Sequence, residues 1–300
     1  MDIDWLEPGS PLYAPTQSWL GRKAPATQTA YTIVLRAWAA WCAEQNLDLA
    51  AARLSDADRF AAHLGETRQA PTVQKYLAAA ASWYRYMVRS ECMERNAFQD
   101  VQRPKTDRHG TPTRTLSVPE TRRLLEAARV SDSPQAARNH TILALLFVLG
   151  LRVAEITALR VESLKTNGGV RVLEVQGKGG VHTERPLVPL VADAVDTYLR
   201  GNPHNSGPLF TTRTGARVSE RAVYDAIRRL AREARLQHPE TVHPHTARHT
   251  FATTARVAGA EVESIQHALG HAAAATTGVY LRTVGQLDED PAHLVGNLLG

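Results

Sequence analysis

The sequence of 300 residues predicts a mainly α-helical protein of two domains, the second of which also contains a small antiparallel β-sheet. Apolar residues repeat at three- and four-residue spacing through most of the first hundred positions, which indicates packed helices. A stretch rich in proline, glycine and basic residues follows and is unsuited to a regular element. Further along, two segments flank a glycine-rich turn and alternate in polarity, which predicts a hairpin.

Composition sets the outer limits of function. The chain carries 35 lysines and arginines against 30 acidic residues, for a net charge of +5. This surplus permits binding to nucleic acid without establishing it. No secretory signal and no run long enough to span a bilayer is visible, so we expect a cytoplasmic protein with no membrane partner. Cys42 and Cys92 lie in amphipathic helical patterns and are expected to be small buried side chains without a function.

The first domain is expected to be a bundle of about four helices over residues 18–102, preceded by an extension over residues 1–17. A basic linker over residues 103–114 then joins it to the second domain. The charge of the linker would suit a path along DNA phosphates, although an ordinary solvated linker fits equally well. The candidates for contact with the DNA backbone are Arg103, Lys105, Arg108 and Arg114.

The second domain, residues 115–300, is predicted to mix helices with short strands. A helix over about 134–149 is apolar nearly all round and should be central. Alternating residues predict a hairpin over 170–175 and 184–188, and residues 209–211 form a possible further strand. Capping and periodicity predict further helices over 189–199, over about 219–235, around His245, around His267 and over about 290–299.

Side chains suited to phosphate chemistry gather near the end of the chain. A tyrosine hydroxyl such as that of Tyr280 becomes a nucleophile when a base and a cation lie beside it. His245 and Arg248 are three residues apart at a helix start and can face one anion, and His271 follows a Leu-Gly helix stop. Each residue taken alone has an ordinary structural explanation. A zinc site built on His245 and its neighbouring histidines is disfavoured, because an HExxH glutamate and nearby cysteines are missing.

Five motifs, taken in order, resemble those of the tyrosine recombinases of the phage integrase family, most closely the Xer-type and other compact members. The resemblance covers nearly the whole chain and implies an N-terminal SAM-like helical core-binding domain, a mixed α/β catalytic domain and a C-terminal exchange helix over about 290–300. The motifs are Leu149-Gly-Leu-Arg152-Val-Ala-Glu155, Lys178 within Gly-Lys-Gly-Gly, His245-Thr-Ala-Arg248, Leu269-Gly-His271 and Thr276-Thr-Gly-Val-Tyr280.

The resemblance implies a role for each matching position. Arg152 and Arg248 would hold the scissile phosphate, and Lys178 would protonate the leaving 5′ oxygen. His245 and His271 would orient the phosphate and exchange protons, and Tyr280 would form a 3′-phosphotyrosyl link to DNA. Glu155 would support the arginines from behind. The implied scheme requires neither a metal ion nor a nucleotide cofactor.

The resemblance also implies partners and a setting. We expect double-stranded DNA as substrate and a homo-tetramer on two DNA sites with exchange of C-terminal helices, or a hetero-tetramer with a second recombinase. The setting would be the nucleoid of a bacterial or archaeal cell, in chromosome-dimer resolution during chromosome partition or in integration and excision of a mobile element. Two alternatives stay open at this point: nicking and religation of the topoisomerase IB type, and a DNA-binding relative without catalysis.

Overall fold

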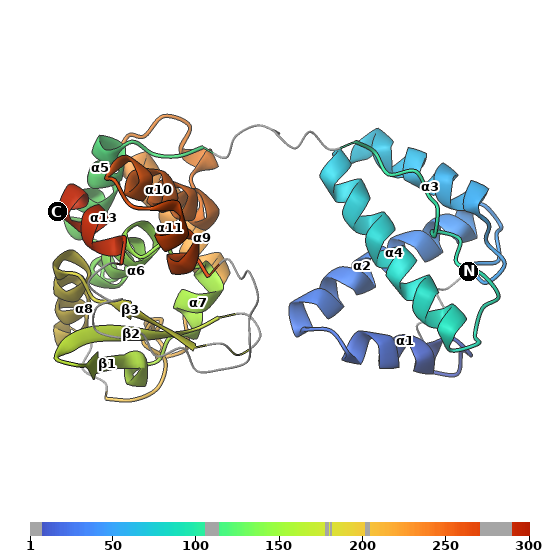
Figure 1. The fold of residues 1–300 in the computed structure, drawn as a ribbon, viewed down its shortest axis with the longest axis horizontal. Helices are drawn as coiled ribbons and strands as arrows, with labels where there is room; N and C mark the ends of the chain where they lie inside the picture. Colours follow the sequence, from blue (N-terminus) through green and yellow to red (C-terminus); the bar gives the residue numbers. More distant parts are fainter. Residues whose placement is uncertain (1–7, 106–113, 178–179, 181, 202–204, 271–289) are drawn as a thin grey trace. The chain divides into compact units, whose positions relative to one another are not determined.

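The computed structural model describes residues 8–105, 114–177, 180, 182–201, 205–270 and 290–300. The chain divides into two compact units, Met1–Thr111 and Pro112–Gly300, each described by itself below (Figure 1). We call the first the helical unit and the second the mixed unit. The division lies within the stretch that was expected to be a linker.

The helical unit contains α1 (Tyr13–Gly21), α2 (Pro25–Glu44), α3 (Leu54–Thr67) and α4 (Ala70–Arg89). A proline stands in the first turn of both α2 and α4, where the missing N–H costs nothing. The core between these helices is aromatic, and its polar atoms bond to one another. The Trp38 indole donates to the Tyr84 hydroxyl at 2.9 Å, and that hydroxyl donates to the Leu49 carbonyl at 2.7 Å.

Helix α1 begins inside the segment that was expected to be an N-terminal extension. It buries Trp19 and Leu20, and its Thr16 hydroxyl accepts a hydrogen bond of 3.0 Å from the Trp83 indole. The residue before the helix, Leu12, offers no capping side chain, so the sequence gives no start signal there. Residues from Tyr13 onward therefore belong to the helical unit.

The mixed unit is built around α6 (Ala136–Val148), whose residues from Thr141 to Val148 are all buried. Helices α5 (Val118–Arg129), α8 (Pro189–Gly201), α9 (Glu220–Glu233) and α10 (Pro244–Val257) pack against it. The short helices α7 (Val153–Ala158) and α11 (Val262–Ala268) complete the surroundings of the candidate site. The segment that was expected to be a central helix, because it is apolar nearly all round, thus lies at the centre of a mainly aliphatic core.

The sheet has three antiparallel strands in the order β1 (Leu164–Asn167), β2 (Val170–Gln176), β3 (His182–Pro186). The hairpin of β2 and β3 pairs Leu173 with Arg185. Strand β1 was not predicted, because its four residues are too few to show alternation. The possible strand at residues 209–211 is reduced to isolated bridges at its flanks. The architecture confirms the predicted mainly α class with a small antiparallel sheet.

The C-terminal helix α13 (Ala292–Leu299) packs on its own mixed unit, against α5, α6, α8 and α10 (Figure 1). Val295 and Leu299 are buried there, and Gly296 lies so close to Val188, the residue before α8, that an added Cβ would be 3.1 Å from it. Leu294 is exposed. Val295 and Leu299 of the helix expected to be exchanged therefore pack on the same chain, and exchange would require the helix to leave this site.

Candidate active site

Arg152 is presented by a glycine turn between two helices. Gly150 follows α6 with a φ of +65°, and a Cβ at this position would lie 2.5 Å from the ring of Phe251 on α10. Only glycine fits both the backbone conformation and the space. Arg152 is the N-cap of α7, and Glu155 accepts from its backbone N–H and from its guanidinium, each at 2.7 Å. One carboxylate thus caps the helix and orients the arginine.

Arg248 projects inward from α10 and is only 8% exposed. Its guanidinium donates to the Gly150 carbonyl at 2.7 Å and to the Leu269 carbonyl. Burial and, to a smaller extent, the positive charge of Arg152 lower the pKa of Arg248 to about 10. Two carbonyl oxygens therefore fix the position of the Arg248 guanidinium, while burial and the nearby Arg152 disfavour its charged form.

Three segments far apart in sequence meet at these two arginines. They are the Gly150 turn, α10 and the residues after α11. The carbonyls of Gly150 and Leu269 both accept from Arg248 of α10. A Cβ added to Gly270 would lie 3.8 Å from the Nη1 of Arg152. Arg152 remains 43% exposed on its side chain, whereas Glu155 is 11% exposed. The arrangement brings two positive charges together, one on the buried Arg248 and one on the accessible Arg152. Such a pair suits an anion that two guanidiniums can contact at once, such as a phosphodiester.

The histidines of α10 lie differently from Arg248. His245 is exposed, and its Nε2 lies 3.1 Å from the Nε2 of His249, one turn further along. His243 caps the helix by accepting from the Thr246 N–H through Nδ1. Burial lowers the pKa of His243, and the charges of His245, Arg228 and His249 lower it further. His245 is thus exposed, whereas Arg248, three residues further along, is buried with its guanidinium bound to two carbonyls.

Several predicted site residues lie outside the described residues. These are Lys178, His271, Tyr280 and Arg108. The described chain stops at Gly270, directly before His271, and resumes at Asp290, ten residues after Tyr280. Gly270, which directly precedes His271 in the sequence, lies next to Arg152.

Arg103 and Lys105 are exposed on the helical unit, after α4. Together with Arg68 they line a groove beside α3 and the start of α4, and the Gln74 amide holds the Pro104 carbonyl at 2.8 Å. Two of the four predicted DNA-backbone candidates thus share one groove with a further arginine. This grouping favours contact with a chain of phosphates.

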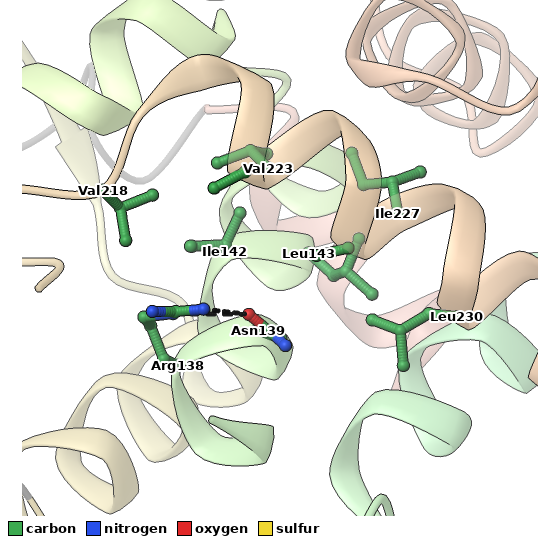
Figure 2. A pocket seen from close by; sticks show the side chains of 10 residues that line it. Arg138, Asn139, Ile142, Leu143, Val218, Val223, Ile227 and Leu230 are labelled. Atoms are coloured by element: carbon green, nitrogen blue, oxygen red, sulfur yellow. Dashed lines mark hydrogen bonds between the residues drawn. The ribbon is translucent and has the colours of Figure 1, made fainter. Parts of the chain in front are cut away.

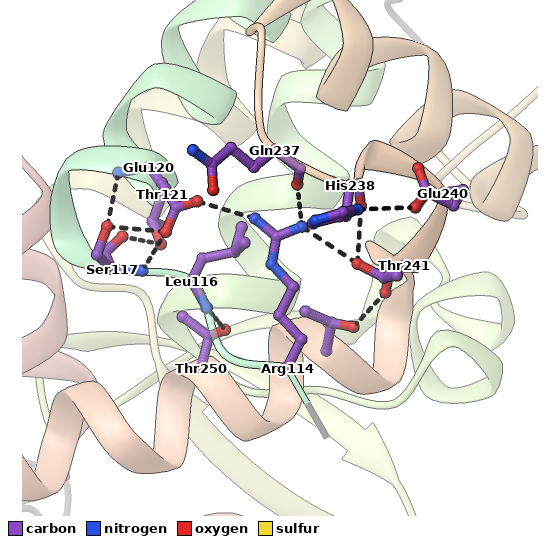
Figure 3. Close-up of polar contacts among 11 residues, drawn as sticks. Arg114, Leu116, Ser117, Glu120, Thr121, Gln237, His238, Glu240, Thr241 and Thr250 are labelled. Carbon is purple, nitrogen blue, oxygen red and sulfur yellow. Dashed lines mark hydrogen bonds and ion pairs between the residues drawn. The ribbon is translucent and has the colours of Figure 1, made fainter. Parts of the chain in front are cut away.

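Arg114 has a different position (Figure 3). Its guanidinium donates to the Gln237 carbonyl, to the His238 carbonyl at 2.9 Å and to Glu120 at 2.9 Å. These contacts tie the first described residue of the mixed unit to α5 and to the loop before α10. We therefore regard Arg114 as a residue that organises this unit, and it is left out of the proposed DNA contacts.

A small pocket between α6 and α9 contains none of the predicted site residues (Figure 2). It is apolar apart from Arg138 and Asn139, and the Arg138 guanidinium is already bonded to Asn139 at 3.1 Å and to the Thr211 carbonyl at 2.9 Å. Within the described part of the chain, no group of three or more His, Cys, Asp or Glu side chains is placed to hold a metal ion, and no helix is long and apolar enough to cross a bilayer.

Two residues beside the arginine pair received no role in the sequence analysis. Arg185 on β3 and Asp290 before α13 form a buried ion pair, and Arg185 is among the charges that lower the pKa of Arg248. The available signal was an arginine in a strand bounded by the apolar run Pro186-Leu-Val-Pro189. Its partner, 105 residues away, gave none.

Comparison with known proteins places the chain among recombinases. Residues 114–285 match the model of the phage integrase family. The chain is 34% identical to a tyrosine recombinase XerC of Pelobacter propionicus over 86% of this chain and 84% of the relative. It is also 34% identical to a tyrosine recombinase XerC of Chromohalobacter salexigens over 87% of each.

Solved structures of similar fold are also recombinases and integrases. XerH site-specific recombinase bound to difH DNA matches with a TM-score of 0.70 at 16% identity, covering 91% of this chain and 76% of that one. The Tn1549 transposon integrase in complex with a circular intermediate DNA matches with a TM-score of 0.65 at 20% identity, covering 86% and 91%. At these identities the likeness concerns the fold.

Proposed function

This chain belongs to the phage integrase family and is a tyrosine-type site-specific recombinase, and we propose that it breaks and rejoins DNA strands through Tyr280. The observation that carries the proposal is the convergence of Arg152 and Arg248, from α7 and α10, beside Gly270. Two guanidiniums can bind both non-bridging oxygens of one phosphodiester and stabilise the charge of its transition state. Such an anion would also relieve the unfavourable charge environment of Arg248.

In the proposed reaction, the Tyr280 oxygen attacks the phosphorus, and the phosphorus–tyrosine bond forms as the bond to the 5′ oxygen breaks. His245 and His271 take part in transfer of the tyrosine proton, and Lys178 gives a proton to the leaving 5′ oxygen. A second DNA 5′ hydroxyl then reverses these steps and restores a phosphodiester. Glu155 keeps the Arg152 guanidinium oriented through the contact of 2.7 Å. Apart from the DNA, every group in this scheme is a side chain of the protein.

We assign double-stranded DNA binding to both units. Arg103, Lys105 and Arg68 of the helical unit would follow the backbone, and the arginine pair would receive the scissile phosphate. The solved XerH and Tn1549 integrase structures carry DNA, which supports this reading. The working assembly would be a tetramer on two DNA sites, of one chain or with a second recombinase, and α13 would be the segment exchanged between subunits.

The biological setting we propose follows the XerC relatives. Identity of 34% to two proteins of that name over most of the chain supports a role at the nucleoid in resolving chromosome dimers. Integration and excision of a mobile element uses the same chemistry, and the identity of the DNA site separates the two. Cleavage of a chromosomal site outside any mobile element supports the first role, and cleavage only at element ends supports the second.

Covalent capture on suicide duplexes tests the reaction. Nicked duplexes drawn from the surrounding genome lose the short strand after cleavage, so the protein stays attached to DNA. We expect a covalent adduct that is absent in Tyr280→Phe and present in the control Tyr224→Phe, whose tyrosine lies on α9. Failure of the wild type to form an adduct on any duplex that it binds would overturn the proposed reaction, and an adduct in Tyr280→Phe would move the nucleophile elsewhere.

A further inference from the structure

Arg185 is a deeply buried charged side chain to which the proposed reaction gives no role. It extends from β3, is 1% exposed, and ranks among the largest fully buried side chains of the described residues. Its Nε donates to Asp290 Oδ2 at 3.0 Å and its Nη2 to Asp290 Oδ1 at 3.1 Å. Its Nη1 donates to the Ala268 carbonyl at 2.7 Å. Each guanidinium nitrogen therefore has an acceptor.

The surroundings of Arg185 connect it with the arginine pair. The guanidinium lies 5.9 Å from the centre of the Phe251 ring, and this ring is the surface against which Gly150 packs. A buried ion pair gains little stability over an apolar pair of the same volume, because two charges lose their water. The pair is therefore better explained by geometry than by stability, because a bidentate contact fixes the direction of the guanidinium as well as its distance.

The partners of Arg185 lie on either side of the segment that carries Tyr280. Ala268 ends α11 and is followed by Leu269, whose carbonyl is bound by Arg248. Asp290 begins the described chain again, and its Oδ1 also accepts from the Ala292 N–H at 2.9 Å, which caps α13. One arginine thus binds both Ala268 and Asp290, which precede and follow the segment with Tyr280 in the sequence.

We propose that Arg185 is a positioning residue for the covalent step: by binding Ala268 and Asp290 together, it fixes both ends of the segment that carries His271 and Tyr280. The inference rests on the proposed function. Arg185 does not touch the phosphate in this scheme and acts through Ala268 and Asp290, which it binds. A nucleophile on a segment with fixed ends samples fewer positions, which raises the fraction of molecules aligned for attack.

Single-turnover cleavage by the full-length protein on a suicide duplex measures the effect. We expect Arg185→Met to lower the cleavage rate on the order of 100-fold, while the Kd for the duplex changes by less than about threefold. Arg185→Lys and Asp290→Asn should each show a smaller loss, because each keeps part of the contact. The double variant Arg185→Met, Asp290→Asn should cleave no more slowly than Arg185→Met alone, because both changes break the same ion pair.

The matched control is a second bidentate pair on the same sheet. Arg171 of β2 binds Asp196 of α8 at 2.9 and 2.7 Å. Both side chains are exposed, and neither residue flanks the segment with Tyr280 in the sequence. Arg171→Met should leave cleavage unchanged. A stability control is Val195→Ala, which removes buried volume from α8 and lowers the melting temperature of the mixed unit without touching Arg185.

Hydrogen exchange provides a readout that does not depend on activity. Arg185→Met should speed the exchange of amides at Ala268, Leu269 and Ala292 more than Val195→Ala does at an equal loss of melting temperature. Equal exchange and equal cleavage rates in these two variants would reduce Arg185 to a stabilising residue and overturn the inference. If the wild type forms no adduct, the proposed function fails. If Arg185→Met leaves amide exchange at Ala268, Leu269 and Ala292 unchanged, the positioning role fails.

Discussion

The two units of this protein use opposite kinds of core. The helical unit buries stacked aromatic rings, and Thr16 is the one buried polar side chain among its described residues outside the aromatic and apolar classes. The mixed unit surrounds an aliphatic core with the buried charges of Glu184, Arg185, Arg248 and Asp290. Buried charges cost free energy, so their confinement to one unit marks where the fold sacrifices stability for the arrangement of a site.

Arg248→Met should separate activity from stability most strongly. Removing one of two phosphate-binding guanidiniums is expected to lower cleavage on the order of 1000-fold, about 4 kcal/mol in the barrier. The free energy of unfolding of the mixed unit should change by less than about 1 kcal/mol, because loss of a charge whose pKa is lowered to about 10 offsets the lost carbonyl contacts. Single-turnover cleavage and chemical denaturation measure the two effects. A large loss of stability would show that Arg248 supports the core.

Trp38→Leu tests the aromatic core in the opposite sense. The indole is fully buried, meets the Phe60 ring edge to face with the ring centres 4.9 Å apart, and donates to Tyr84, so we expect a loss of about 3 kcal/mol in stability. The loss should appear in the unfolding transition of the helical unit alone. Differential scanning calorimetry of the full chain measures both transitions, and a matching shift in the mixed unit would show that the units unfold together.

Gly150→Ala should strain the turn that presents Arg152. The positive φ and the contact of 2.5 Å to Phe251 together predict a loss of about 2 kcal/mol and a slower cleavage step. Gly169→Ala is the control, since its φ is +84° but its added Cβ meets nothing within 4 Å. The control should lose only the backbone part, about 1 kcal/mol, with cleavage intact. Equal effects of the two changes would rule out a special role for the Phe251 contact.

His243 gives the smallest effect, and it depends on pH. Because the folded pKa of His243 is lowered below 6.5, the unfolded chain binds its proton first as pH falls, so folding becomes less favourable below about pH 6.5. His243→Asn keeps a capping acceptor without a titrating group. The free energy of unfolding of the variant should match that of the wild type at pH 8 and exceed it at pH 5. Urea denaturation at both values checks this, and a constant difference would exclude the linkage.

The sequence predicted the features that depend on local pattern. The hairpin of β2 and β3 and the buried α6 follow from alternation and from apolar content, and the family motifs named Arg152 and Arg248 before any contact was known. Strand β1 and helix α1 were missed because one is short and the other lacks a capping side chain. Contacts between Arg185 and Asp290 join distant segments, and one sequence carries no signal for such a pairing.

The packing of α13 has a consequence for the order in which the chain folds during synthesis. The helical unit is complete once residue 111 has been made, so it can fold while the remainder is still being translated. The mixed unit includes Val295 and Leu299 in the same core as α6. Its core therefore stays open until nearly the whole unit has been made. The ribosome thus delivers a folded helical unit well before the unit that carries the arginine pair can close.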